Sequence, residues 1–80
     1  MFGMSDQFSS VEKKMHHEMM EAKGDTTAET WIKKMIAHHQ GAIDMSELIQ
    51  HHTKDPKVLA EARKTAAENR KSLAELRAKM

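Results

Sequence analysis

Histidine and methionine occur in this chain in numbers and spacings that suit metal chemistry. The 80 residues include six histidines and eight methionines but no cysteine. The histidines form three adjacent pairs, which are His16–His17, His38–His39 and His51–His52. The segment 35–45, MIAHHQGAIDM, sets the middle pair between two methionines. Thioether sulfur is a soft donor, and together with imidazole nitrogen it favours Cu(I) and, by the same softness, Ag(I).

Helical spacing would bring these donors onto one surface. Met35 lies three residues before His38 and four before His39, so one turn presents a thioether beside two imidazoles. Met45 follows His38 by seven residues and falls on the same side of the helix. We therefore predict Met35, His38 and His39 as inner ligands of a soft monovalent ion, with Met45 as a further donor.

The preceding helix can add sulfur to this region. In an antiparallel hairpin that turns near Gly24–Asp25, simple counting places Met15 opposite Met35. The same count places Met19 opposite Trp31. We predict Met15 and Met19 as additional donors. An outer set of lower affinity, in which the outward histidines could also hold Cu(II), would consist of His16, His17 and Met20.

Other metal chemistries and catalysis fit the pattern less well. Zinc sites usually combine histidine with thiolates or carboxylates, and calcium and magnesium need clusters of oxygen ligands. The predicted inward arc has neither. Di-iron bundles need several inward glutamates and an E-x-x-H spacing, which does not occur in this chain. No arrangement typical of a nucleophilic enzyme is present either, so we expect a binding protein and not an enzyme.

A second interpretation needs no metal. Methionine at helical spacing is most often flexible core filler, and an inward histidine is most often a hydrogen-bonded core residue. The chain would then be a helical interaction or oligomerisation module with structural or pH-responsive histidines, because imidazole in general titrates at about pH 6.5. For His51–His52 the structural interpretation is preferred, since a protonated imidazole near a helix C-terminus interacts favourably with the helix dipole.

Start and stop signals place three helices around these residues. Gly24 suits the left-handed position that ends a helix, and Thr26 with Glu29 three residues later has the spacing of a capping box. Asp55 followed by Pro56 is typical of an N-cap and a first helical position. The sequence predicts an all-α, antiparallel three-helix chain in a single domain over residues 1–80, with helices at about 5–23, 27–53 and 56–79.

Composition limits the classes of partner. A net charge of +1 and only three aromatic residues argue against nucleic acid, and no apolar run approaches the roughly 18 residues of a membrane span. Only twelve residues are Val, Ile, Leu or Phe, and disulfides are excluded. A chain this small needs further stabilisation. Besides the metal ion, we expect a second copy to close the exposed apolar stripe in a homo-oligomer, either a dimer or a higher assembly.

The motif M-I-A-H-H-Q-G-A-I-D-M-S, followed by D-P-K-V-L-A-E-A, resembles a copper-associated bacterial family known as domain of unknown function 305 (DUF305). The resemblance covers about residues 30–70. It implies that Met35, His38, His39 and Met45 are the signature positions, and that the fold is a ferritin-like bundle of the four-helix type. Better-understood members resemble proteins that bind copper or silver and contribute to resistance, which implies a copper buffer or carrier in metal tolerance.

The resemblance also implies a cellular location, and the last helix departs from the family pattern. It implies a periplasmic or secreted protein, while the absence of a secretory signal leaves a cytoplasmic location open. The last helix of the family tends to read Q-x-x-E-I-x-x-M. The aligned residues here are Asn69, Ser72, Leu73 and Leu76. Because this helix lacks that methionine, we expect the site to be built mainly from the first two helices or across a subunit boundary.

Overall fold

Three helices account for most of residues 6–80, which are the residues that the structure, a computed structural model, describes. They are α1 (Ser9–Glu21), α2 (Thr27–Ile49) and α3 (Pro56–Arg77), and residues 6–80 contain no β-strand. The all-α prediction is confirmed. Helices α2 and α3 start at the predicted residues. Helix α2 ends at Ile49, before the predicted residue 53. The predicted start of the first helix, residue 5, lies outside the described residues, and α1 begins at Ser9.

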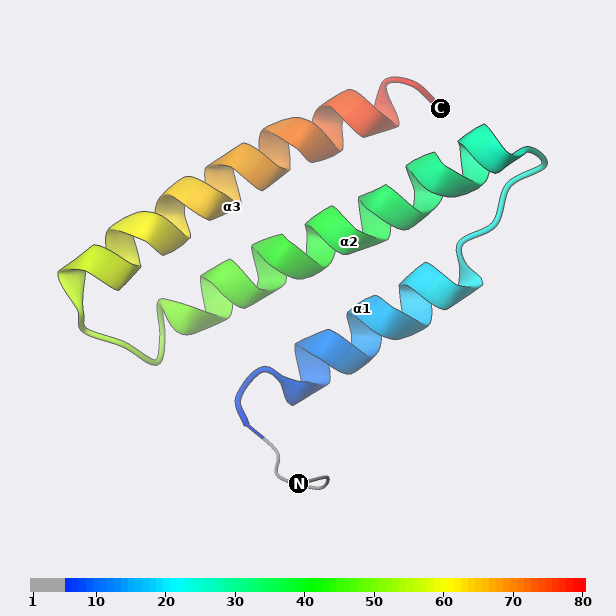
Figure 1. Ribbon diagram of the computed structural model, residues 1–80. Coiled ribbons are helices and arrows are strands. Elements are labelled where there is room, and N and C mark those ends of the chain that lie inside the picture. The colour runs from blue at the N-terminus through cyan, green and yellow to red at the C-terminus, as the bar shows by residue number, and fades with distance from the viewer. Residues whose placement is uncertain (1–5) are drawn as a thin grey trace.

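The helices lie side by side in a single layer. Helix α2 is in the middle, and α1 and α3 each contact α2 but not one another (Figure 1). The layer measures 44 × 32 × 14 Å, and its radius of gyration is 14.3 Å. A compact domain of this length would have a radius of gyration of about 12 Å. The chain alone therefore leaves two broad faces in contact with solvent.

The N-termini of α2 and α3 are capped as the sequence predicts. The Thr26 hydroxyl accepts a hydrogen bond from the backbone N–H of Glu29 at 3.1 Å. The Asp55 carboxylate accepts from the backbone N–H of Lys57 at 2.9 Å, with Pro56 in the first turn. Each cap pairs a backbone donor that the helix itself leaves unpaired.

Replacing Asp55 with alanine should lower the free energy of unfolding by about 1 kcal/mol, because the Lys57 N–H then loses its acceptor. Urea denaturation followed by circular dichroism measures this loss. Asp25 is an exposed aspartate in the segment between α1 and α2 and is not a cap, so Asp25→Ala is the matched control. Equal losses in the two variants would contradict a capping role for Asp55.

Gly24 does not adopt the left-handed conformation that the sequence predicts, and that prediction is wrong. The chain leaves α1 through Ala22, whose backbone is extended at φ −74° and ψ 110°. A Cβ atom at Gly24 would overlap the Cβ of Glu29 and lie 3.2 Å from the backbone nitrogen of Thr30. The N–H of Gly24 also donates to the Thr30 hydroxyl at 3.0 Å. The glycine is therefore needed for close approach to α2.

The segment 22–26, whose first and last residues have extended backbone, sets the alignment of α1 with α2. It runs back along the first turns of α2, where the Lys33 ammonium donates to the carbonyl of Lys23 at 3.1 Å. One turn further along α1, the Lys34 ammonium donates to the carbonyl of Met19 at 2.5 Å. An extended residue advances about 3.3 Å and a helical residue about 1.5 Å, so this segment covers more of α2 than a tight turn would.

The predicted pairing of α1 with α2 is wrong for this reason. Met15 lies against Gly41 and not opposite Met35. Met19 lies beside Lys34, further along α2 than Trp31. The Met15 sulfur therefore lies beyond Met35, near the middle of α2.

The core is thin and lies mainly on the α3 side of α2. Its buried apolar side chains are Ile43, Ala62, Ala66, Leu73 and Leu76. No side chain described has an exposure below 2%, and α1 contributes no buried residue. None of the helices within residues 6–80 combines the length and apolar character needed to cross a membrane.

Candidate metal-binding site

Methionine and histidine side chains from α1 and α2 meet in an open depression, here called the α1–α2 depression. It contains five of the nine predicted donors. Its lining residues are Met15, His16, Met19, Met20, Lys34 and His38. Three thioethers and two imidazoles therefore border the same surface hollow.

Helical spacing explains how α1 contributes four of these residues. Met15 and Met19 are four residues apart and form one row, and His16 and Met20 form the adjacent row. The first row is half-buried against α2, while the second is exposed, with Met20 74% exposed. From α2, the exposed imidazole of His38 completes the set. The depression thus has an inner sulfur row and an outer, solvent-facing row.

Gly41 allows α1 to approach α2 at this point. It is buried, and the Met15 side chain lies directly on it. A Cβ atom at Gly41 would lie 2.6 Å from Met15 Cγ and 3.0 Å from Met15 Cβ, and it would overlap the sulfur. Our reading of the sequence missed this residue, although a lone glycine inside a strong helical pattern often marks close packing.

The donor types in the depression suit a soft ion better than a hard one. No carboxylate lines it, and the Lys34 ammonium at its edge donates to the Met19 carbonyl. Across residues 6–80, no group of three or more His, Asp or Glu side chains is placed to hold a metal ion. Hard divalent cations need such oxygen-rich groups. Any ion bound between α1 and α2 would therefore depend on thioether sulfur.

The second predicted group, Met35 and His39, lies on the α3 side of α2. The two residues line a separate depression, here called the α2–α3 depression. Its other lining residues are Trp31, Ser72, Glu75, Leu76 and Lys79. His39 Nδ1 lies 2.7 Å from the carbonyl oxygen of Met35. Because a carbonyl can only accept, Nδ1 carries the proton and Nε2 keeps the lone pair that a metal would use.

The predicted inner ligands thus line two different depressions, His38 that between α1 and α2, and Met35 and His39 that between α2 and α3. The rings of His38 and His39 meet edge to face, with centroids 5.7 Å apart, but they line different depressions. Met45 is half-buried and lines neither of them. His17 lies apart from His16, in a third depression between α1 and α2 that Lys33, Gln40 and Arg77 also line.

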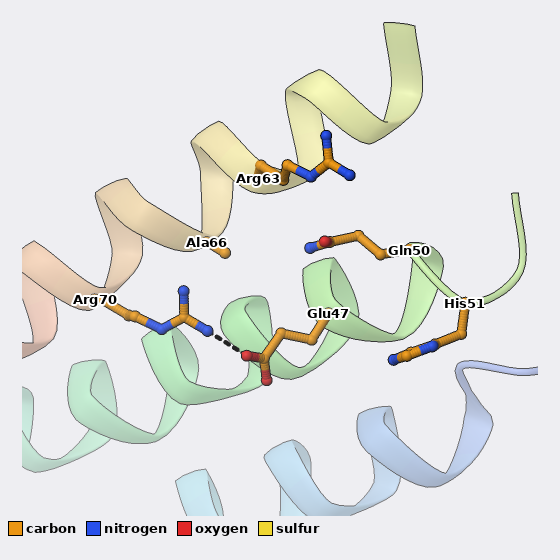
Figure 2. Close-up of a pocket in the computed structure, with 6 residues that line it drawn as sticks. All are labelled: Glu47, Gln50, His51, Arg63, Ala66 and Arg70. Carbon is orange, nitrogen blue, oxygen red and sulfur yellow. Dashed lines mark hydrogen bonds and ion pairs between the residues drawn. The ribbon is translucent and has the colours of Figure 1, made fainter. Parts of the chain in front are cut away.

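The opposite broad face carries a polar depression between α2 and α3, shown in Figure 2. Its lining residues are Glu47, Gln50, His51, Arg63, Ala66 and Arg70. The Arg70 guanidinium pairs with the Glu47 carboxylate, and none of the six lining residues carries sulfur (Figure 2). His51 and His52 follow the end of α2 and are exposed.

Comparison with known families identifies one match. The family model described as Domain of unknown function (DUF305) matches residues 3–80, well beyond the range of about 30–70 over which the sequence motif suggests a resemblance. Comparisons with curated proteins and with solved structures found no match.

Proposed function

Since the chain belongs to the DUF305 family, whose description assigns no activity, we propose a function from its own geometry. The protein binds Cu(I) or Ag(I) and acts as a copper buffer or carrier in metal tolerance. It holds the ion without catalysing a reaction on a substrate. The observation that carries this proposal is the meeting of three thioethers and two imidazoles, without a carboxylate, in the α1–α2 depression.

The residues of the depression take different roles in this proposal. Met15, Met19 and His38 are the inner ligands, because the two methionines are half-buried and His38 approaches from the other helix. His16 and Met20 are exposed and form an outer set that meets the ion first. Neutral sulfur ligands stabilise the monovalent state of copper, and the same softness admits silver. At the exposed histidines, including His17, Cu(II) is the alternative ion.

Met35 and His39 form a second place for a soft ion. The Nδ1 hydrogen bond to the Met35 carbonyl holds the His39 ring with Nε2 available. Trp31 lines the same depression, and its ring face can attract a cation. As the only tryptophan of the chain, Trp31 offers a fluorescence signal specific to this side of α2.

The remaining parts of the proposal concern assembly and location. A second copy packed on a broad face of the layer would surround α2 with further helices and complete a bundle of the ferritin-like, four-helix type. A periplasmic or secreted location agrees with a role in copper tolerance. The rival function, a helical interaction module without metal, is favoured by the exposure of His16, His17, His51 and His52.

Titration with Ag(I) in chloride-free buffer, against a competing chelator and with native mass spectrometry, tests the proposal. We expect stoichiometric binding by the wild-type chain. We expect severe weakening in the double variant Met15→Leu/Met19→Leu, because leucine keeps the apolar volume but lacks the sulfur. Met80→Leu is the matched control, since Met80 is 65% exposed and lies outside both depressions.

The interaction-module function predicts a different outcome for the same titration. It predicts no tight stoichiometric complex, and it predicts identical behaviour for the wild-type chain and the double variant. That result would refute metal binding at the α1–α2 depression.

A further inference from the structure

Helices α1 and α3 contact nearly opposite sides of α2. Helix α1 packs on the side that carries Gly41, whereas α3 shares depressions with His39 and Gln50. At about 100° per residue, Gly41 lies roughly 160–180° around the helix from these two residues. Helix α2 therefore has two uncovered edges, one on each broad face of the layer (Figure 1).

One of these edges has a heptad pattern, and we call it the α2 stripe. It consists of Trp31, Met35, His38, Ala42, Met45 and Ile49. Trp31 is 57% exposed and His38 is also exposed, while the other four residues are only half-buried. Successive gaps of four and three residues over more than two heptads are the pattern with which one helix packs along another.

The other edge of α2 has a different character. Its residues include Lys33, Gln40, Asp44, Glu47 and His51. Glu47 and His51 border the polar depression of Figure 2. Gln40 donates to Asp44 at 3.0 Å, and Lys33 donates to the carbonyl of Lys23. One broad face of the layer is thus suited to water, while the other presents an apolar seam along its central helix.

We propose that a second copy of this chain covers the α2 stripe, with its α2 antiparallel to the first. The gaps along the stripe read 4, 3, 4, 3 and 4, which is the same in both directions. Reversing one copy about residue 40 therefore places each stripe residue opposite another. The facing pairs are Trp31 with Ile49, Met35 with Met45, and His38 with Ala42.

The antiparallel arrangement also packs better than the parallel one. It sets the large His38 against the small Ala42, as interdigitating layers require. A parallel pair would face His38 with His38 and leave Ala42 opposite Ala42, which crowds one layer and leaves a gap in the next. Helix dipoles also oppose one another favourably when the two chains are antiparallel.

The flat shape of the layer supports a second copy as the occupant. The whole broad face, polar margins included, spans 44 × 32 Å, which leaves room for the roughly 800 Å² per partner of a stable interface. The α1–α2 and α2–α3 depressions both adjoin the α2 stripe, since they include His38 and Met35 respectively. A flat, self-complementary surface fits another three-helix layer better than it fits a single peptide.

The pairing would give Met45 a partner that the single chain does not provide. Met45 of the partner subunit would lie beside Met35, so the second place for a soft ion, formed by Met35 and His39, would gain a donor from the other copy. This part rests on the proposed function. The pairing itself rests only on the α2 stripe and can be tested without metal.

The mass of the metal-free protein in solution tests the pairing. Sedimentation equilibrium should give twice the chain mass of 9.1 kDa. Ala42→Glu puts a charge in the centre of the α2 stripe and should return the mass to that of one chain. Gln40→Glu makes a comparable change on the polar edge and should leave the mass doubled. Circular dichroism of both variants checks that the helices remain. A wild-type protein at the single-chain mass would overturn the proposal.

Disulfide trapping tests the orientation, because the chain has no cysteine of its own. The single variants Met35→Cys and Met45→Cys are mixed without metal in a glutathione redox buffer. Antiparallel pairing predicts a disulfide between the two different variants. Asp44→Cys, on the polar edge, should remain uncoupled from Met35→Cys. Disulfides formed chiefly between identical variants would indicate a parallel pair and overturn the antiparallel register.

The two proposals can fail separately. A metal-free dimer with the expected disulfide but without affinity for Ag(I) would refute the proposed function alone. Ag(I) binding by a chain that stays at its single mass would refute the pairing alone. If both hold, Met45→Leu should weaken Ag(I) binding in the dimer but not in the monomeric Ala42→Glu background.

Discussion

Removing the His38 imidazole is expected to weaken Ag(I) binding at the α1–α2 depression far more than removing the neighbouring imidazole of His39. His38 lines the hollow that contains Met15 and Met19, whereas His39 lies on the α3 side. Loss of an outer supporting group in metal sites typically costs about 10–100-fold in affinity. Loss of a direct ligand should cost at least that much.

The measurement compares His38→Gln with His39→Gln in the chelator-competed Ag(I) titration. Glutamine keeps a polar side chain but supplies no nitrogen lone pair suited to a soft ion. His39→Gln is the matched control, since it makes the same change one residue along α2. Its own effect should appear instead in the Trp31 fluorescence response, because Trp31 and His39 line the same depression. Equal loss of affinity in both variants would contradict the division of the histidine pair.

Replacing Gly41 with leucine is expected to separate α1 from α2, and this is the largest structural effect that we expect from one substitution. Even a Cβ atom at Gly41 overlaps the Met15 sulfur, and a leucine adds three further carbons. Overpacking of this kind typically costs about 1–3 kcal/mol. Intrinsic helix propensity works in the opposite direction and favours leucine over glycine by almost 1 kcal/mol.

Urea denaturation and the Ag(I) titration together measure the consequence. Gly41→Leu should lower both the free energy of unfolding and the affinity for Ag(I). A double-mutant cycle of Gly41→Ala with Met15→Ala isolates the contact, because Met15→Ala removes the sulfur and Cγ that the new Cβ would meet. A Gly41→Leu protein that is more stable than wild type, with unchanged Ag(I) affinity, would contradict the close approach of α1.

The helices themselves could be predicted from local signals. Thr26 and Asp55 mark the starts of α2 and α3, and their side chains accept the expected backbone hydrogen bonds. Such caps depend on residues only two or three positions apart in the chain. The all-α fold and the starts of these two helices therefore follow from short stretches of sequence.

The position of α1 along α2 could not be predicted in the same way. It depends on whether segment 22–26 turns sharply or runs extended, and Gly24 permits either conformation. The choice is made by contacts between segments, such as the bonds of Lys33 and Thr30 to this stretch. Counting residues from an assumed turn therefore placed Met15 opposite the wrong part of α2.

The types of donor could be read from the sequence, but not their division into sites. Met35, His38 and His39 all fall within one wide arc of α2, and periodicity alone leaves them together. In the structure they line two depressions, because α1 packs beside His38 while α3 packs beside Met35 and His39. Gly41, which has no chemistry of its own, determines how close the α1 sulfurs come to His38.

Among the three helices of residues 6–80, α1 contacts α2 but not α3, and it buries none of its residues fully. Its detachment therefore breaks one interface and costs less free energy than unfolding the α2–α3 hairpin, where the buried apolar side chains lie. The inner sulfur row moves with α1, while His38 stays behind on the hairpin. Under the proposed function, transient undocking of this one short helix would release the ion to another molecule, at a rate set by local opening while the rest of the fold persists.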